Sequence, residues 1–234
     1  DGCMKETKEC SVIVENNIQT KEKSFASGIN FYKLVWIFVI GCFVGVVIET
    51  LVCFSSTGQI ESRKGVIYGP FSPVYGCGAV VFTLLLYKIR NISSMFIFII
   101  SAVAGGAFEF LCSWVQEVLL GTISWEYSDL PLNLQGRTNL LYSIYWGVLG
   151  MIFIKHIYPF ISRNIEKIPN KIGVIITWVL FVFMVFDVVI SFCAVKRQTQ
   201  RSYDIPAQNK FQQFLDNTYT DDYLKKIYPN MIIL

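Results

Sequence analysis

The chain has 234 residues, of which 53% are apolar and only 16% charged, with a net charge of +3 and a mean hydropathy of +0.49. An average soluble domain carries about 25% charged residues, so this composition excludes an ordinary soluble protein and indicates an integral membrane protein. The charge is small and no basic tract occurs, so we expect no nucleic-acid partner.

Residues 1–30 form a polar segment without an apolar core, so they do not read as a secretory signal peptide. Two of the seven cysteines lie here, and Cys3 and Cys10 could pair if the segment were exported. The cysteines show no zinc-binding spacing, and His156 is the single histidine. We therefore expect no metal and no other cofactor.

Five apolar stretches follow, and each approaches the length that a helix needs to cross a hydrocarbon core of about 30 Å. They are residues 31–54, 73–89, 95–120, 139–158 and 172–195, and 73–89 is the shortest of them. The sequence thus predicts an all-α integral membrane protein of about five transmembrane helices. Residues 31–195 form its transmembrane domain, and residues 196–234 form a C-terminal tail.

With five spans, residues 1–30, the 88–94 turn and the 155–171 loop share one side of the membrane, which carries the larger number of Lys and Arg residues. The positive-inside rule then places the N-terminus in the cytoplasm. The 55–72 loop, the 121–138 loop and the tail share the other side.

The tail contains signals for short amphipathic helices. In "TDDYLKKIYP", Thr220 is a candidate N-cap, acids fill the first turn, lysines come late and Pro229 ends the pattern. Phe211 and Phe214 precede it at helical spacing. Such helices would lie against the protein or the membrane interface, and the alternative is a solvated tail.

The first and third spans resemble each other. Aligning Gly45 with Gly105 also aligns Glu49 with Glu109, and each span is followed by a glycine-containing loop and an aromatic-glycine entry to the next span. This pattern is consistent with a tandem duplication of a helix-loop-helix unit, with chance similarity as the alternative.

Four acids lie within the apolar stretches. A carboxylate in mid-bilayer costs about 2.5–3.5 kcal/mol on insertion scales, so such residues generally face a polar interior. The positions are Glu49, Glu109, Glu117 and Asp187. Glu117 lies near a helix end and could reach the interface instead, whereas Asp187 needs a partner from another span.

Polar residues of two loops should converge over these acids, because both loops lie on the same side of the membrane. Together with Glu49, Glu109 and Glu117, the predicted ligand-binding residues are Arg63, Tyr68, Tyr75, Trp125, Tyr127, Asp129, Asn133, Arg137 and Tyr142. Arg137 suits a carboxylate or a phosphate, and it could simply pair with Asp129 or Glu109. The aromatic residues could also form an interfacial belt.

The stretches "RKGVIYGPFSPVYGCG", "GGAFEFLCSW" and "SWEYSDLPLNLQGRTNLLYSIYWG", together with the tail, resemble the CmpB-like family of ABC-transporter type IV membrane proteins of bacteria. The resemblance covers roughly residues 33–230. It implies a multi-pass protein of the bacterial plasma membrane and a permease component. The matching residues are Glu49, Gly65, Tyr68, Gly69, Pro70, Pro73, Tyr75, Gly76, Glu109, Trp125, Tyr127, Asn133, Gly136, Arg137, Tyr142 and Gly147.

Three functions fit these observations. The first is a permease or substrate-binding subunit that works with a separate ABC ATPase, because the chain has no P-loop motif of its own. The second is a membrane-embedded enzyme acting on a lipid or isoprenoid, although no nucleophile or metal motif supports it. The third is a structural or sensory membrane protein whose polar cluster locks the helices together.

Overall fold

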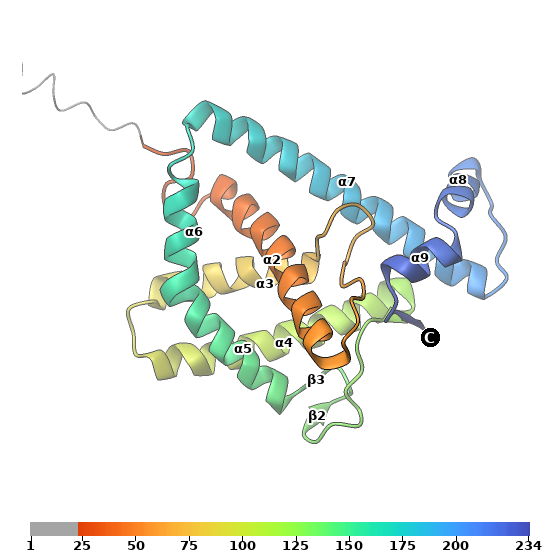
Figure 1. Cartoon of the computed structure of the whole chain (residues 1–234), viewed down its shortest axis with the longest axis horizontal. Coiled ribbons are helices and arrows are strands. Elements are labelled where there is room, and N and C mark those ends of the chain that lie inside the picture. The colour runs from red at the N-terminus through yellow and green to blue at the C-terminus, as the bar shows by residue number, and fades with distance from the viewer. Residues whose placement is uncertain (1–22) are drawn as a thin grey trace, which may run out of the picture.

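The computed structural model describes residues 23–234, and regular structure in this range is almost entirely helical (Figure 1). Cys3 and Cys10 lie outside the described residues. The helices are α2 (Phe31–Thr57), α3 (Pro73–Leu86), α4 (Ser94–Leu120), α5 (Leu140–Ile152), α6 (Tyr158–Ile165), α7 (Asn170–Ser202), α8 (Lys210–Thr218) and α9 (Asp221–Ile227). A 3-10 turn, η1 (Tyr87–Ile89), follows α3, and a π-helical turn, η2 (Phe153–Ile157), joins α5 to α6.

Four helical stretches are long and apolar enough to cross a membrane: α2, α4, α7 and the continuous stretch Leu140–Ile165. The remaining predicted span corresponds to the shorter apolar stretch Pro73–Ile89, formed by α3 and η1. The all-α membrane class is therefore confirmed, with four full-length spans and one short one where five were predicted.

The predicted 155–171 loop is wrong in its first half. Helix continues through η2 and α6 to Ile165, so only a short turn separates α6 from α7. The charged residues here suggested a loop, but Tyr158 and Ile165 are buried and hold α6 to the bundle. Pro159 lies just after the π-helical turn η2, where the regular hydrogen-bonding pattern of the helix is already interrupted.

The segments that connect the helices lie at two opposite ends of the bundle, because successive spans run in opposite directions. At one end, the Phe25 amide donates to Asn170 Oδ1 at 2.8 Å. At the other end, the hydroxyls of Tyr68 and Tyr219 lie 2.8 Å apart, and the Leu234 amide donates to the Gly121 carbonyl at 3.0 Å. The 55–72 loop, the 121–138 loop and the tail therefore meet at one end.

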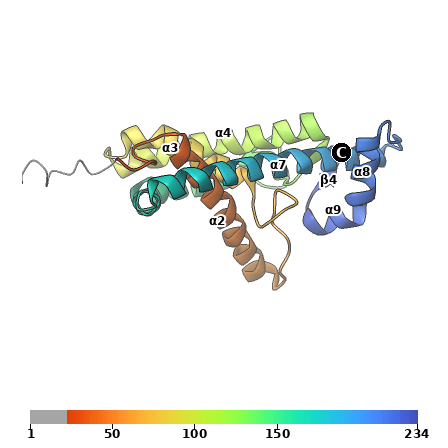
Figure 2. The same ribbon diagram turned by 90° about the horizontal axis from the view of Figure 1, so that it is seen from above.

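Helix α2 packs closely on α3, and α4 packs closely on α5, by equivalent contacts. A Cβ atom on Gly45 would lie 2.2 Å from Tyr75 Cγ, and one on Gly105 would lie 2.3 Å from Trp146 Cβ. An aromatic side chain thus covers the aligned glycine in each pair. Figure 2 shows α2 running steeply out of the layer that contains α3, α4 and α7.

Two further contacts recur in the same way. Gly76 lies against the backbone and ring of Phe38, and Gly147 lies against the backbone and ring of Phe98. Gly41 faces Ala79 in the first pair, and in the second pair Ser101 faces Gly150. The register of the two helix pairs therefore agrees with the alignment of Gly45 with Gly105, which supports the predicted duplication.

Gly105 offers a test of this packing. We expect Gly105→Ala to lower the free energy of unfolding by about 1–3 kcal/mol, because the added methyl group would overlap the Trp146 side chain. Gly78→Ala is the matched control, since its nearest neighbour, Phe108 Cε1, would lie at 3.5 Å. Thermal unfolding in detergent compares the two variants, and equal unfolding temperatures would contradict the close approach of α5 to α4.

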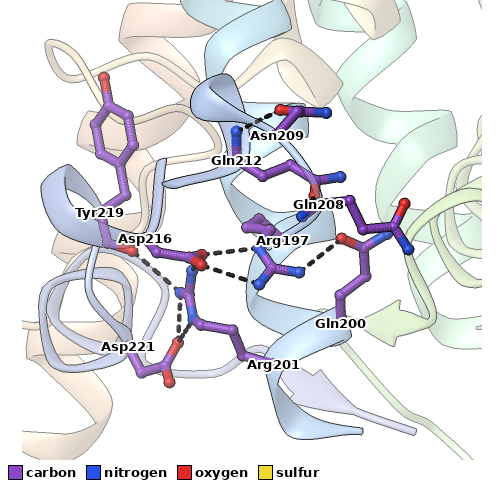
Figure 3. A network of polar contacts seen from close by, with 9 residues as sticks. All are labelled: Arg197, Gln200, Arg201, Gln208, Asn209, Gln212, Asp216, Tyr219 and Asp221. Atoms are coloured by element: carbon purple, nitrogen blue, oxygen red, sulfur yellow. Dashed lines mark hydrogen bonds and ion pairs between the residues drawn. The ribbon is translucent and has the colours of Figure 1, made fainter. Parts of the chain in front are cut away.

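The tail is docked on the protein. Arg197 of α7 donates from Nε and Nη2 to the two carboxylate oxygens of Asp216 in α8, at 2.8 and 2.9 Å (Figure 3). Arg201 donates to Asp216 at 2.6 Å and to Asp221 at 2.5 and 2.9 Å. Thr220 caps α9 through the Tyr223 amide, as predicted.

An apolar cluster lies beside this network. Leu215 and Leu224 of the tail pack with Ile190 and Ala194 of α7 and with Ile67 of the 55–72 loop. In addition, β4 (Ile232–Ile233) pairs antiparallel with β1 (Thr122–Ile123). The tail therefore holds both loops of this end, and the alternative of a solvated tail is wrong.

Candidate functional site

Glu109 is the buried centre of the candidate site. It lies on α4 with 7% of its surface exposed, and its carboxylate accepts hydrogen bonds from the hydroxyls of Tyr127 at 3.1 Å and Thr138 at 2.8 Å. Both donors belong to the segment between α4 and α5. No salt bridge joins Glu109 to a basic side chain within residues 23–234.

Arg137 lies in the segment between α4 and α5, close to Glu117, which is two turns along α4 from Glu109. Its guanidinium pairs with Glu117 and donates to Ser113 Oγ at 3.2 Å. The sequence offered Asp129 or Glu109 as partners for Arg137, and the structure gives Glu117 instead. Trp125 Nε1 donates to the Arg137 carbonyl at 2.9 Å, so it fixes the backbone of this residue.

Two tyrosine rings stack beside Glu109. The ring centroids of Tyr127 and Tyr142 are 4.5 Å apart with an interplanar angle of 18°. Burial raises the pKa of Tyr127, and the neighbouring Glu109, Tyr142 and Tyr75 raise it further. The hydroxyl therefore stays protonated at neutral pH and serves as a hydrogen-bond donor to the carboxylate.

The second carboxylate, Glu49, has a comparable neighbour. The Tyr75 hydroxyl donates to Glu49 Oε2 at 2.8 Å, so both aligned acids receive a tyrosine hydroxyl. Arg63 Nη1 lies 3.9 Å from Glu49 Oε1, while its Nη2 donates to Glu61 at 3.2 Å and to Cys53 Sγ at 3.0 Å. Arg63 therefore interacts with both Glu49 and Glu61.

Tyr68 lies elsewhere than expected. Its amide donates to Asp187 Oδ1 at 3.0 Å, and its hydroxyl contacts Tyr219 of the tail. The partner that Asp187 needs therefore comes from a loop backbone and from Ser191, whose hydroxyl lies 3.3 Å away. No hydrogen bond or salt bridge links the 55–72 and 121–138 loops in the part of the chain that the structure describes.

One predicted residue, Asn133, braces the loop itself. Asn133 Nδ2 donates to the carbonyls of Ser128 and Leu130, and its Oδ1 accepts from the Gly136 amide at 3.0 Å. Gly136 has a φ of +68°, a conformation that favours glycine. Asp129 is exposed to solvent.

Thr138 and Ser113 were missed as donors at this site. Ser113 lies four residues from both Glu109 and Glu117 and therefore on the same helix face, and this spacing was the available signal. Thr138 carries no such signal, because only the fold of the segment turns it toward Glu109. Short strands β2 (Asn133–Leu134) and β3 (Thr138–Asn139) pair antiparallel and set this turn.

One family model matches the chain, described as "Putative ABC-transporter type IV", over residues 36–192. This match covers more than half of the sequence. The chain belongs to this family. No curated protein and no solved structure gives a match.

All twelve predicted site residues lie within the part that matches the ABC-transporter type IV family, between Glu49 and Tyr142. The tail lies beyond it, including Arg197 and Asp216. The family thus supports a transporter-related membrane protein, and the two helix pairs with Glu49 and Glu109 fall inside the matched range.

Proposed function

We propose that the chain is the permease or substrate-binding membrane subunit of an ABC-type transport system of the bacterial plasma membrane. The observation that carries this proposal is the site around Glu109 in a member of an ABC-transporter family. Burying a carboxylate in a membrane helix is costly, and helix packing does not require one. The site would hold the substrate, and a separate ATPase would supply the energy.

The proposed orientation places the N-terminus in the cytoplasm and the Glu109 end outside. The ATPase would then dock at the opposite end, on the turn between α6 and α7. This end presents the exposed cationic residues Arg163, Lys167 and Lys171. The surface is small.

Co-purification tests this role. We expect a P-loop ATPase to co-purify with the protein extracted in mild detergent from its own cells. Arg163→Glu combined with Lys167→Glu should reduce the captured ATPase several-fold, because it reverses the charge of the proposed docking turn. Lys225→Glu combined with Lys226→Glu, at the opposite end, is the matched control and should retain it.

Absence of any ATPase from the wild-type preparation would contradict the transport proposal. A lipid product that disappears in Glu109→Gln would favour the membrane-embedded enzyme instead. A Glu109→Gln protein that is merely less stable, with no change in bound ligand or partner, would favour the structural role.

A further inference from the structure

We propose that the Glu109 site takes a ligand that carries an ammonium group. The inference rests on the proposed function, because it names the substrate class of that same site. Its basis is the distribution of charge among the described side chains, the free acceptor positions on Glu109 and the aromatic rings around it.

Both arginines near the site are already matched by acids. Arg137 pairs with Glu117, and Arg63 is shared between Glu61 and Glu49. An anionic ligand would have to separate one of these pairs, at the cost of leaving an acid unpaired in a partly buried place. Each guanidinium is therefore engaged with at least one protein acid, although the Nε of each has no hydrogen-bond partner among the described residues.

Glu109 forms no salt bridge among the described residues, a property that it shares with Asp187, the other buried acid. A carboxylate offers about four lone-pair positions, and the hydroxyls of Tyr127 and Thr138 use two of them. Neutral donors alone leave a buried negative charge without compensation, which is costly in a membrane helix. An ammonium group supplies both the positive charge and the N–H donors that the free positions accept.

The rings around Glu109 suit a cation. Tyr127 and Tyr142 stack on each other, and the Tyr127 hydroxyl donates to the Glu109 carboxylate. Aromatic faces attract ammonium groups, and desolvated pairs contribute most. Because Glu109 is 7% exposed, the ligand would enter when the loop that carries Tyr127 moves aside.

The probes are n-butylammonium and its anionic counterpart butyrate, added to detergent-purified protein at about pH 7.5, where an alkylamine is ionised as lysine is. We expect n-butylammonium to raise the unfolding temperature of the wild type in a saturable way and butyrate to have no effect. Glu109→Gln should need at least tenfold more n-butylammonium for the same shift. Glu126→Gln, an exposed acid of the same loop, is the matched control and should respond as the wild type does.

If Glu109→Gln does not fold, Tyr142→Leu replaces it, because this variant keeps the carboxylate and removes one ring. It should also weaken the response to n-butylammonium several-fold. Stabilisation by butyrate alone, or a response to n-butylammonium that the folded variant retains in full, would overturn the proposal. No response of the wild type to n-butylammonium would overturn it as well.

The two proposals fail in distinguishable ways. A co-purifying ATPase together with a site that ignores n-butylammonium rejects only the substrate class. A clear response to n-butylammonium without any ATPase rejects only the transport role.

Discussion

We expect Asp216→Ala to destabilise the docked tail by about 3–5 kcal/mol, the range measured when one partner of a buried ion pair is removed. Arg197 is only 3% exposed and donates to both oxygens of Asp216. Without Asp216 it would keep Gln200 as its hydrogen-bonding partner but lose its counter-charge. Limited proteolysis and chemical unfolding in detergent measure the change, and the tail should become cleavable first.

Asp222→Ala is the matched control, because Asp222 is exposed on α9 and forms no salt bridge among the described residues. Its loss should cost about 0.3–1 kcal/mol, the usual value for an acid in the first turn of a helix. The double variant Arg197→Met/Asp216→Leu should recover much of the lost stability, because it removes the buried guanidinium group together with its counter-charge. Equal proteolysis of Asp216→Ala and Asp222→Ala would contradict this account of the tail.

The same pair makes docking of the tail sensitive to acid. Hydrogen bonds from Arg197 lower the pKa of Asp216 below its ordinary value of about 3.9, and Arg201 lowers it further. The unfolded state then binds more protons than the folded state as the pH falls. The contribution of the pair is therefore complete above about pH 4 and is lost as the pH falls through the folded pKa. Asp216→Ala should lack this part of the acid response.

The helical class and the helix positions follow from the sequence, because apolar runs of sufficient length leave few alternatives in a membrane. The start and end of α4 fall within one residue of the predicted span. The error at 155–171 has a clear cause. Charged residues there suggested a loop, yet Lys155 reaches Ser94 Oγ at 2.7 Å from within the helix.

The sequence predicted at which end of the bundle the candidate site lies, but it did not predict which side chains pair there. Alternating spans require the two loops and the tail to meet, and they do. Which acid Arg137 selects depends on the turn that β2 and β3 impose, because this turn directs the guanidinium to Glu117 rather than to Glu109. Tyr68 was assigned to the site for its position in the loop, but Asp187 and Tyr219 hold it against α7 and the tail.

We expect Glu166→Ala to lower the free energy of unfolding by about 3 kcal/mol, the lower end of the range for buried pairs because Glu166 is itself partly exposed. Lys33 of α2 is 1% exposed, and its ammonium group binds Glu166 and donates to Ser162 Oγ at 2.6 Å. The hydrogen bond from Lys33 also lowers the pKa of Glu166, so the acid is ionised at neutral pH. Removing it would leave a buried ammonium group with one neutral partner.

Lys167→Ala is the matched control in the same turn, and it should change the unfolding free energy by less than about 0.5 kcal/mol. Lys33→Met/Glu166→Ala should be more stable than Glu166→Ala alone, because the double variant leaves no buried charge unpaired. A double variant no more stable than Glu166→Ala would contradict the pairing. Since Lys33 and Glu109 lie at opposite ends of the bundle, folded Glu166→Ala should still respond to n-butylammonium, which separates the stability of α2 and α6 from the chemistry of the site.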